Sequence, residues 1–161
     1  MKKIELHTTL TVFETLEELP GAVKTLMFAA IEARKKAYAP YSRFTVGAAL
    51  LLENGEVITG NNQENASYPS GLCAERVAIY YAGATFPGIP VKTIALSGTS
   101  AHTKINTPIP PCGACRQAIA EYEIKQNRPI SIYFMGETGN ILKAEALKDL
   151  LPLLFERSFL T

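Results

Sequence analysis

Three cysteines and a glutamate stand at spacings that suit a metal site with a proton-transferring group beside it. Cys112 and Cys115 form a Cys-x-x-Cys directly after two prolines, so both sulfurs can face one ion if a helix begins there. Cys73 lies upstream, two residues before Glu75, at the start of another predicted helix. Helix amino ends carry partial positive charge and free N–H groups, which stabilise thiolates. Two such helix starts pointing at one place would hold three thiolates around one Zn²⁺ per chain.

The number of protein ligands separates a catalytic zinc site from a structural one. Structural sites are usually closed by four protein ligands, whereas catalytic sites keep one position for water. His7 and His102 are the histidines that could supply a fourth ligand, but neither has a partner at ligand spacing. By itself the Cys-x-x-Cys also fits a redox pair or a structural zinc knuckle. The three cysteines together with Glu75 favour a catalytic site.

Glu75 and Arg76 are the charged residues placed to serve such a metal centre. Glu75 is the candidate proton carrier, with a plain helix-terminal carboxylate stabilised by the helix dipole as its alternative. Three thiolates give Zn²⁺ a net charge of −1, so something must offset that charge. Arg76 is the candidate, donating to one or more cysteine sulfurs from outside the ligand set. Its alternative is an ordinary surface arginine on a helix.

Hydrophobic periodicity predicts the elements that must position these residues. Asn54-Gly55 between two apolar runs is a strong hairpin signal, and Gly83 suits the end of the helix that carries Cys73. The predicted helices cover 20–38, 72–82, 112–123 and 144–151, and the predicted strands cover 44–52, 57–60, 91–97, 130–135 and part of 4–13. This order predicts an α/β fold with one mixed β-sheet of about five strands sandwiched by helices. Residues 1–161 form a single domain in this interpretation, with residues 1–20 a possible N-terminal strand or extension.

Composition and charge narrow the classes of partner. The 161 residues carry 16 basic and 15 acidic side chains, a net charge of +1, which is not the basic footprint of a nucleic-acid binder. We also expect no association with membranes, because no apolar run approaches the ~20 residues needed to span a bilayer. The N-terminus lacks the features of a signal peptide, so a cytoplasmic location is the default expectation. Three cysteines cannot all pair within one chain, and a reducing cytosol would not favour disulfides.

Three stretches of the sequence, residues 38–50, 64–76 and 111–117, resemble the small single-domain zinc-dependent cytidine deaminases. Zinc deaminases carry His-x-Glu followed by Pro-Cys-x-x-Cys, and here Cys73 replaces the histidine, as in the three-cysteine variant. The resemblance implies hydrolytic deamination of cytidine and 2′-deoxycytidine to uridine and 2′-deoxyuridine, with release of ammonia. It implies zinc-bound hydroxide as the nucleophile, Glu75 as the proton shuttle and a role in pyrimidine salvage.

The same resemblance implies residues that bind the nucleoside. Asn62 and Glu64 match an Asn-x-Glu that binds the ribose 3′-hydroxyl, and Phe44 matches an aromatic residue that packs against the pyrimidine. Without the resemblance, the first two would be a polar loop pair and Phe44 a core residue of a strand. Backbone groups of Ala74 and Cys73 would flank the base.

Two further expectations concern the pocket entrance and the assembly. Tyr68 is expected to help close the pocket. Phe155 resembles a C-terminal aromatic that reaches into a neighbouring subunit's site, because the family is usually a homotetramer; a homodimer is the alternative. The apolar tail around Phe155 independently suggests an interface.

Other functions stay open at this point. The chain could deaminate a related aminopyrimidine such as a nucleoside antibiotic, although Asn62 and Glu64 favour an ordinary nucleoside. A deaminase that edits nucleic acid is disfavoured by the near-zero charge and by the lack of a stretch of interleaved basic and aromatic residues. A structural zinc protein without enzymatic activity is the third alternative.

Overall fold

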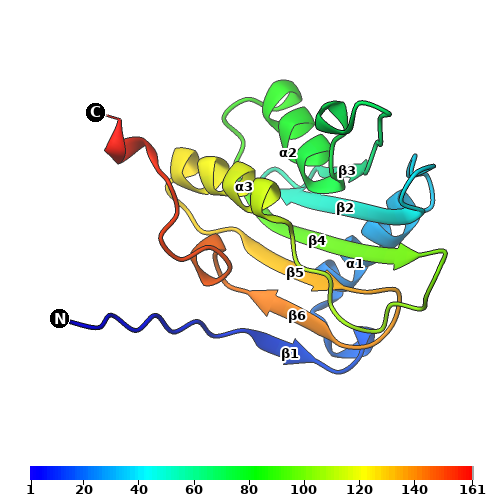
Figure 1. Cartoon of the computed structure of the whole chain (residues 1–161), viewed down its shortest axis with the longest axis horizontal. Coiled ribbons are helices and arrows are strands. Elements are labelled where there is room, and N and C mark those ends of the chain that lie inside the picture. The colour runs from blue at the N-terminus through cyan, green and yellow to red at the C-terminus, as the bar shows by residue number, and fades with distance from the viewer. Residues whose placement is uncertain (161) are drawn as a thin grey trace.

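The computed structural model describes residues 1–160 and shows one six-stranded sheet covered by three helices (Figure 1). The strands are β1 (Thr11–Phe13), β2 (Phe44–Leu52), β3 (Val57–Asn61), β4 (Val91–Ser100), β5 (Ser131–Met135) and β6 (Ile141–Ala144). The helices are α1 (Gly21–Arg34), α2 (Ala74–Thr85) and α3 (Gly113–Gln126). The strand order is β1-β6-β5-β4-β2-β3. Only β4 and β5 pair in parallel, because α3 crosses between them, and the other neighbours in the described sheet are antiparallel.

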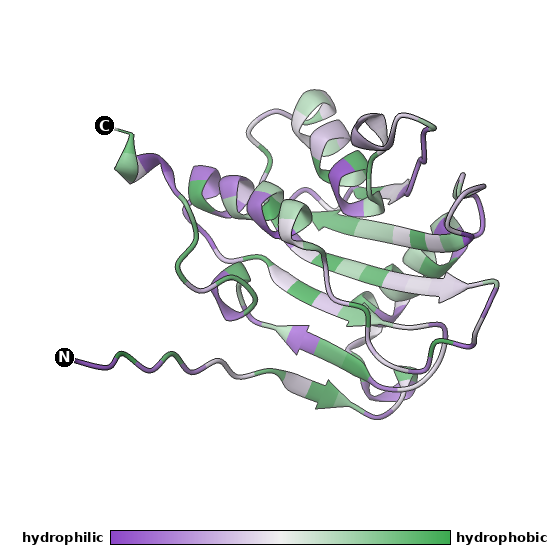
Figure 2. Ribbon diagram, viewed as in Figure 1, coloured by the Kyte–Doolittle hydropathy of each residue, from purple (hydrophilic) through white to green (hydrophobic). Residues whose placement is uncertain are grey.

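Helices cover both faces of the sheet, with α1 on one face and α2 and α3 on the other (Figure 1). Alternation along β4 divides its side chains between two cores, since successive residues of a strand face opposite ways. Ile94 and Leu96 pack in the core beneath α2 and α3, whereas Ala95 packs with Met27 of α1. Figure 2 shows that the central strands are largely apolar, as expected for strands buried on both faces. No helix within residues 1–160 is both long and apolar enough to cross a bilayer.

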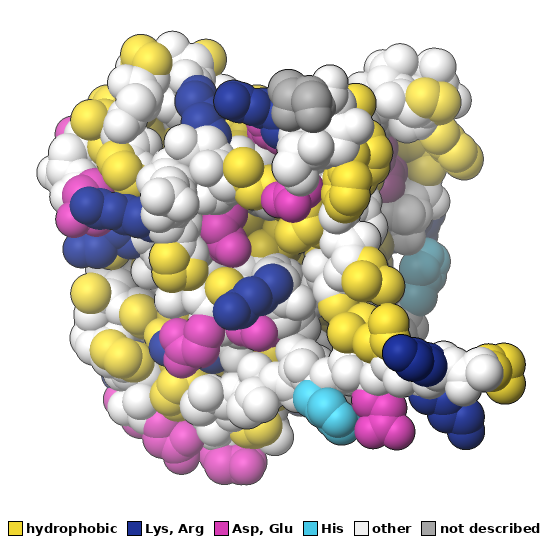
Figure 3. Space-filling model, turned by 90° about the vertical axis from the view of Figure 1, so that its left-hand side faces the viewer, with side chains coloured by type: hydrophobic (Ala, Val, Ile, Leu, Met, Phe, Trp, Pro, Cys, Tyr) yellow, Lys and Arg dark blue, Asp and Glu magenta, His cyan; other side chains and the backbone are white. Residues whose placement is uncertain are grey.

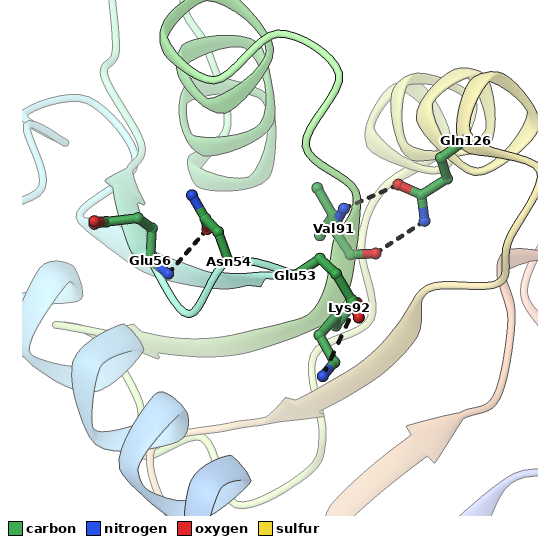
Figure 4. A network of polar contacts seen from close by, with 6 residues as sticks. All are labelled: Glu53, Asn54, Glu56, Val91, Lys92 and Gln126. Carbon is green, nitrogen blue, oxygen red and sulfur yellow. Dashed lines mark hydrogen bonds and ion pairs between the residues drawn. The ribbon is translucent and has the colours of Figure 1, made fainter.

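The predicted hairpin is present, and its turn connects β2 to β3. Gly55 adopts a positive φ of 89°, which a side chain would oppose, and the Asn54 side chain accepts a hydrogen bond from the Glu56 amide at 3.1 Å (Figure 4). On the neighbouring strand, the Gln126 amide group pairs with both backbone polar groups of Val91, each at 2.9 Å (Figure 4). The last turn of α3 is thereby attached to the start of β4.

Two predictions about helices were wrong: the end of one helix at Gly83 and the presence of another over residues 144–151. Gly83 lies inside α2 rather than at its end, and a Cβ at this position would stand 2.3 Å from the hydroxyl oxygen of Tyr122. Close approach to α3 therefore explains this glycine. The predicted helix 144–151 is replaced by the end of strand β6 and a short 3₁₀ turn at Leu147–Asp149. Ala144, the only residue of this range that belongs to β6, is extended because it pairs with Ile132 of β5, which local propensity did not predict.

The remaining differences are in the limits and number of elements. Helix α1 ends at Arg34 instead of Tyr38, and the first strand is limited to Thr11–Phe13. The sheet has six strands, against the expected number of about five, because the sequence pattern missed β6. The predicted α/β class and the helical layers on both faces are confirmed.

Two glycines let the helices lie very close to the sheet. A Cβ on Gly47 in β2 would lie 2.0 Å from the carbonyl oxygen of Ala30 in α1. A Cβ on Gly60 in β3 would lie 2.6 Å from the carbonyl oxygen of Ala74, the first residue of α2. Since neither backbone could yield easily, glycine is required at both positions. Gly60 thus allows the amino end of α2 to rest directly on the sheet.

Candidate zinc centre and active site

The three cysteine sulfurs converge at the amino ends of two helices. Cys73 is the residue immediately before α2, Cys112 is the residue immediately before α3, and Cys115 lies in the first turn of α3. The Sγ atom of Cys112 is 3.9 Å from that of Cys73 and 3.5 Å from that of Cys115. Zn–S bonds of 2.3 Å at a tetrahedral angle require sulfurs about 3.8 Å apart, so the cluster fits a zinc ion.

The group of side chains in residues 1–160 that could hold a metal ion consists of these three cysteines. All three sulfurs lie within 4.8 Å of one another, and neither His7 nor His102 belongs to the group. His7 is exposed on the N-terminal segment beside Glu5, so its position does not suit a fourth ligand. Three protein ligands leave a tetrahedral ion one position for another molecule, which is the arrangement of catalytic zinc sites.

Hydrogen bonding within the cluster favours thiolate at Cys73. The Cys115 thiol donates toward Cys73 and Arg76 stands nearby, which together lower the pKa of the Cys73 thiol to about 5. The same hydrogen bond and burial raise the pKa of Cys115, because it is the donor of the pair. Zinc takes thiolate rather than thiol, so a ligand that is already ionised near neutral pH assists metal capture.

Arg76 lies in the first turn of α2 and faces the cluster. Its Nη2 atom is 3.8 Å from the Cys73 sulfur, and hydrogen bonding to that sulfur raises the pKa of the guanidinium. Its Nε atom is buried and has no hydrogen-bond partner among the described residues. This geometry places a permanent positive charge where three thiolates leave a negative one, as the proposed charge-balancing role requires.

Glu75 is a buried carboxylate at the inner end of the site. Its side chain is 5% exposed, and burial raises its pKa to about 7. It lines an inner cavity of about 330 Å³ together with Cys73, Cys112 and Phe44. The structure thus brings a desolvated carboxyl group and two of the metal ligands to one small apolar chamber.

A second, more open cavity of about 450 Å³ adjoins this chamber. Its lining includes Glu64, Tyr68 and Arg76, and it shares Ser42, Asn62 and Cys73 with the inner cavity. The shared residues show that the two spaces meet at the metal ligand. An elongated molecule can therefore place one end against the cysteines and the other against Glu64.

Glu64 and Asn62 differ in how they are held. The Glu64 carboxylate accepts bonds from the Tyr41 and Ser42 amides at 2.9 and 3.3 Å and from the Ser42 hydroxyl at 2.5 Å, which lower its pKa. The Asn62 side chain accepts from the Val46 amide at 2.7 Å and donates to the carbonyl of a β2 residue at 2.9 Å. Asn62 therefore also fixes the start of β2.

The other predicted binding residues lie at different depths. Ala74 is fully buried as the first residue of α2 and lines neither of the two cavities. Tyr68 is exposed at the edge of the outer cavity, with its ring centroid 6.1 Å from that of Tyr41. Phe155 stacks on Phe159 with centroids 5.7 Å apart and lines neither cavity of its own chain within the described residues.

Sequence reasoning overlooked Ser42, which lines both cavities and holds Glu64. Ser42 lies within the stretch 38–50 that resembles the family, but no role was assigned to it. The next residue, Arg43, has a positive φ of 52°, and the chain turns there into β2. It also overlooked Arg34, whose buried guanidinium donates to the Ser97 hydroxyl at 2.7 Å on the opposite face of the sheet. No local pattern marks either contact, because each joins distant segments.

The fold and this cluster define a zinc-dependent α/β hydrolase, and comparison with known families makes the class specific. Residues 21–128 match the family model for the cytidine and deoxycytidylate deaminase zinc-binding region. The chain therefore belongs to this family of zinc-dependent deaminases.

Individual relatives agree with that assignment. A cytidine deaminase of Halalkalibacterium halodurans is 50% identical over 123 residues, which is 76% of this chain and 86% of the relative. One from Mycobacterium tuberculosis is 42% identical over 111 residues, 67% of this chain and 79% of the relative. The crystal structure of a cytidine deaminase from Burkholderia pseudomallei superposes with a TM-score of 0.71 at 41% identity, covering 81% of this chain and 97% of that protein.

Proposed function

We propose that this protein deaminates cytidine and 2′-deoxycytidine to uridine and 2′-deoxyuridine with release of ammonia, as a step of pyrimidine salvage. The observation that carries the proposal is the meeting of Glu75, Cys73 and Cys112 in one inner cavity that continues into a polar outer cavity. The relatives named above are called cytidine deaminases, which supports the same substrate class.

The two cavities correspond to the two halves of a nucleoside. The inner cavity is apolar apart from its reacting groups, and Phe44 provides an aromatic surface for the pyrimidine ring. The outer cavity presents the Glu64 carboxylate, whose lowered pKa keeps it ionised and able to accept from a ribose hydroxyl. A base without a sugar would lose the hydrogen bond to Glu64, so we expect it to bind less well than the nucleoside.

Proton transfers at the base fall to Glu75. Zinc, when bound to the three cysteines, supplies the Lewis acid that makes hydroxide available near neutral pH. The Glu75 carboxylate lies in the same cavity as the ligands, where it can accept the proton of the attacking water and deliver it to the ring nitrogen N3. It then takes the proton of the hydroxyl group added to C4 and passes it to the amine, which leaves C4 as ammonia while the C4 carbonyl of the product forms. Arg76 balances the charge of the thiolates throughout.

We also propose that the active form is a homotetramer in the cytoplasm. Apolar side chains gather on the face from which both termini emerge (Figure 3), and the exposed members in the C-terminal tail are Leu153, Phe155, Phe159 and Leu160. Such a patch is typical of an interface. Phe155 would cross this interface to a neighbour's site. Three cysteines kept as thiols for zinc suit a reducing compartment.

One experiment tests the reaction and the metal together. Purified protein with its zinc counted per chain is mixed separately with cytidine, 2′-deoxycytidine, cytosine, a cytosine-containing nucleoside antibiotic and a cytosine-containing single-stranded oligonucleotide, and ultraviolet absorbance reports conversion to the uracil product. We expect one zinc per chain, turnover of both nucleosides and little turnover of cytosine. Faster turnover of the antibiotic, or of a single-stranded oligonucleotide, would reject the proposed substrate.

Sedimentation of wild type and Phe155→Ala, with activity measured at each concentration, tests the assembly.

A further inference from the structure

Arg116 follows the last zinc ligand in the sequence, and its side chain joins two segments that lie far apart along the chain. Its Nε atom donates to the carbonyl of Pro111 at 2.8 Å, and its Nη1 atom donates to the carbonyl of Leu150 at 2.5 Å. The first carbonyl belongs to the residue before the ligand Cys112. The second belongs to the segment after β6 that leads into the C-terminal tail. One planar cation therefore holds the metal loop and the C-terminal segment together.

The loop before Cys112 needs such an attachment. Pro110 and Pro111 carry no backbone N–H, so this stretch can be fixed only by packing and through its carbonyl groups. Cys112 occupies the N-cap position of α3, but within the described chain its side chain makes no capping hydrogen bond. The bond from Arg116 to Pro111 thus anchors the backbone immediately before the ligand to the first turn of the ligand-bearing helix.

The C-terminal segment supplies the fixed side of this contact. Glu123, on the same helix, accepts from the amides of Ile130 and Leu147 at 2.9 and 3.0 Å. Leu147 is buried in the core beneath α3, so the segment that ends at Leu150 is firmly packed. Gln117 adds a more peripheral bond to the carbonyl of Phe155 at 2.8 Å.

We propose that Arg116 is a positioning residue for the metal centre, holding Cys112 and Cys115 at the mutual geometry that zinc requires. Its guanidinium offers rigid donors on more than one side, which two carbonyls on separate segments can share. Without it, the prolyl loop is released at its carbonyl while α3 loses its tie to the packed segment. The sulfur separation of 3.5 Å within the pair would then no longer be enforced in advance of metal binding.

The test measures zinc rather than turnover. Purified full-length holoprotein is titrated with a chromogenic chelator to obtain the zinc dissociation constant, and the rate of zinc release is followed under excess chelator. Arg116→Gln should weaken zinc binding about 10- to 100-fold, the range seen when partners around metal ligands are removed. The cobalt-substituted variant should also show altered thiolate-to-metal absorption bands.

Two variants on the same helix serve as matched controls. Gln117→Ala removes a bond to the C-terminal segment but none to the metal loop, and Glu123→Gln weakens the attachment of Leu147 at the far end of α3. Both should keep a zinc dissociation constant within about twofold of wild type, even where the urea midpoint falls. Equal loss of zinc affinity in either control would overturn the proposal, since general loosening of α3 would then explain the effect.

A conservative variant keeps the proposal testable if Arg116→Gln does not fold. Arg116→Lys retains the charge and the alkyl stem, but a single ammonium cannot reproduce the forked contact to Pro111 and Leu150. We expect it to weaken zinc binding as well. Zinc affinity, release rate and cobalt spectrum all equal to wild type in a folded Arg116 variant would refute the positioning role, whether or not the chain deaminates cytidine.

Discussion

Replacing Glu75 by glutamine separates its contribution to catalysis from its cost to stability. The variant keeps the size of the side chain but cannot exchange a proton. If Glu75 relays protons at N3 and at the leaving amine, kcat for cytidine should fall by at least about 10²–10⁴-fold. Zinc should stay at one per chain, because the three sulfurs are unchanged. Absorbance decay at saturating cytidine and a metal count measure both.

The structure also predicts the sign of the stability change. Burial raises the pKa of Glu75 from its usual value of 4.5 to about 7. Between these pH values the Glu75 carboxyl group is therefore ionised in the unfolded chain and protonated in the folded one. Wild-type stability therefore declines as pH rises from about 4.5 to 7 and is constant above that. At about 1.4 kcal/mol for each pKa unit, the decline is about 3 kcal/mol. The Glu75→Gln variant has no carboxyl group at this position, so its free energy of unfolding lacks this decline with pH.

Urea unfolding of the two proteins after removal of zinc, at pH 5 and pH 8, gives the comparison. The difference between Glu75→Gln and wild type should grow in favour of the variant by about 3 kcal/mol across this range, less the part already present at pH 5. A difference independent of pH would refute the argument from burial. Turnover within a few-fold of wild type would refute the catalytic role.

Three further predictions address the metal, the sugar and the packing. Serine at any of the three ligand cysteines should leave less than one zinc per chain by atomic emission; a full equivalent would exclude that cysteine from the site. Glu64→Ala should raise KM for cytidine about tenfold or more through loss of a charged hydrogen bond, but not KM for 3′-deoxycytidine. Equal increases for both nucleosides would contradict the ribose assignment. Gly60→Ala should lower the free energy of unfolding by about 1–3 kcal/mol in urea titrations, since its Cβ would stand 2.6 Å from a carbonyl of α2. Gly21→Ala, with no atom within 4 Å, is its control and should not be destabilising.

The metal cluster could be predicted from sequence because its signals are local. A Cys-x-x-Cys after two prolines and a Cys-x-Glu before an apolar run both mark helix starts, and the structure places Cys73 and Cys112 immediately before α2 and α3. The Asn54-Gly55 turn was equally readable, since φ above zero at Gly55 is a property of that residue alone. In each case one short segment contains the whole physical cause.

Features that depend on distant partners could not be predicted in this way. Gly83 looked like a helix end because the nearby ring of Tyr122, which excludes a side chain there, comes from another helix. Strand β6 was missed in the sequence because its extended conformation depends on pairing with β5 and β1, which come from distant parts of the chain. Asn62 was expected to bind sugar, and nothing in its surroundings along the chain indicated that its amide also secures the start of β2.

The short strand β1 has a consequence for the behaviour of the protein in solution. Thr11–Phe13 pairs with Ile141–Lys143 and so occupies backbone donors and acceptors on the outer side of β6. An unprotected strand edge is a template onto which another chain can add, and it seeds aggregation. The N-terminal segment therefore protects this edge of the sheet. A protein shortened past Phe13 would expose the backbone donors and acceptors of β6 to other chains, and would become harder to refold and to concentrate.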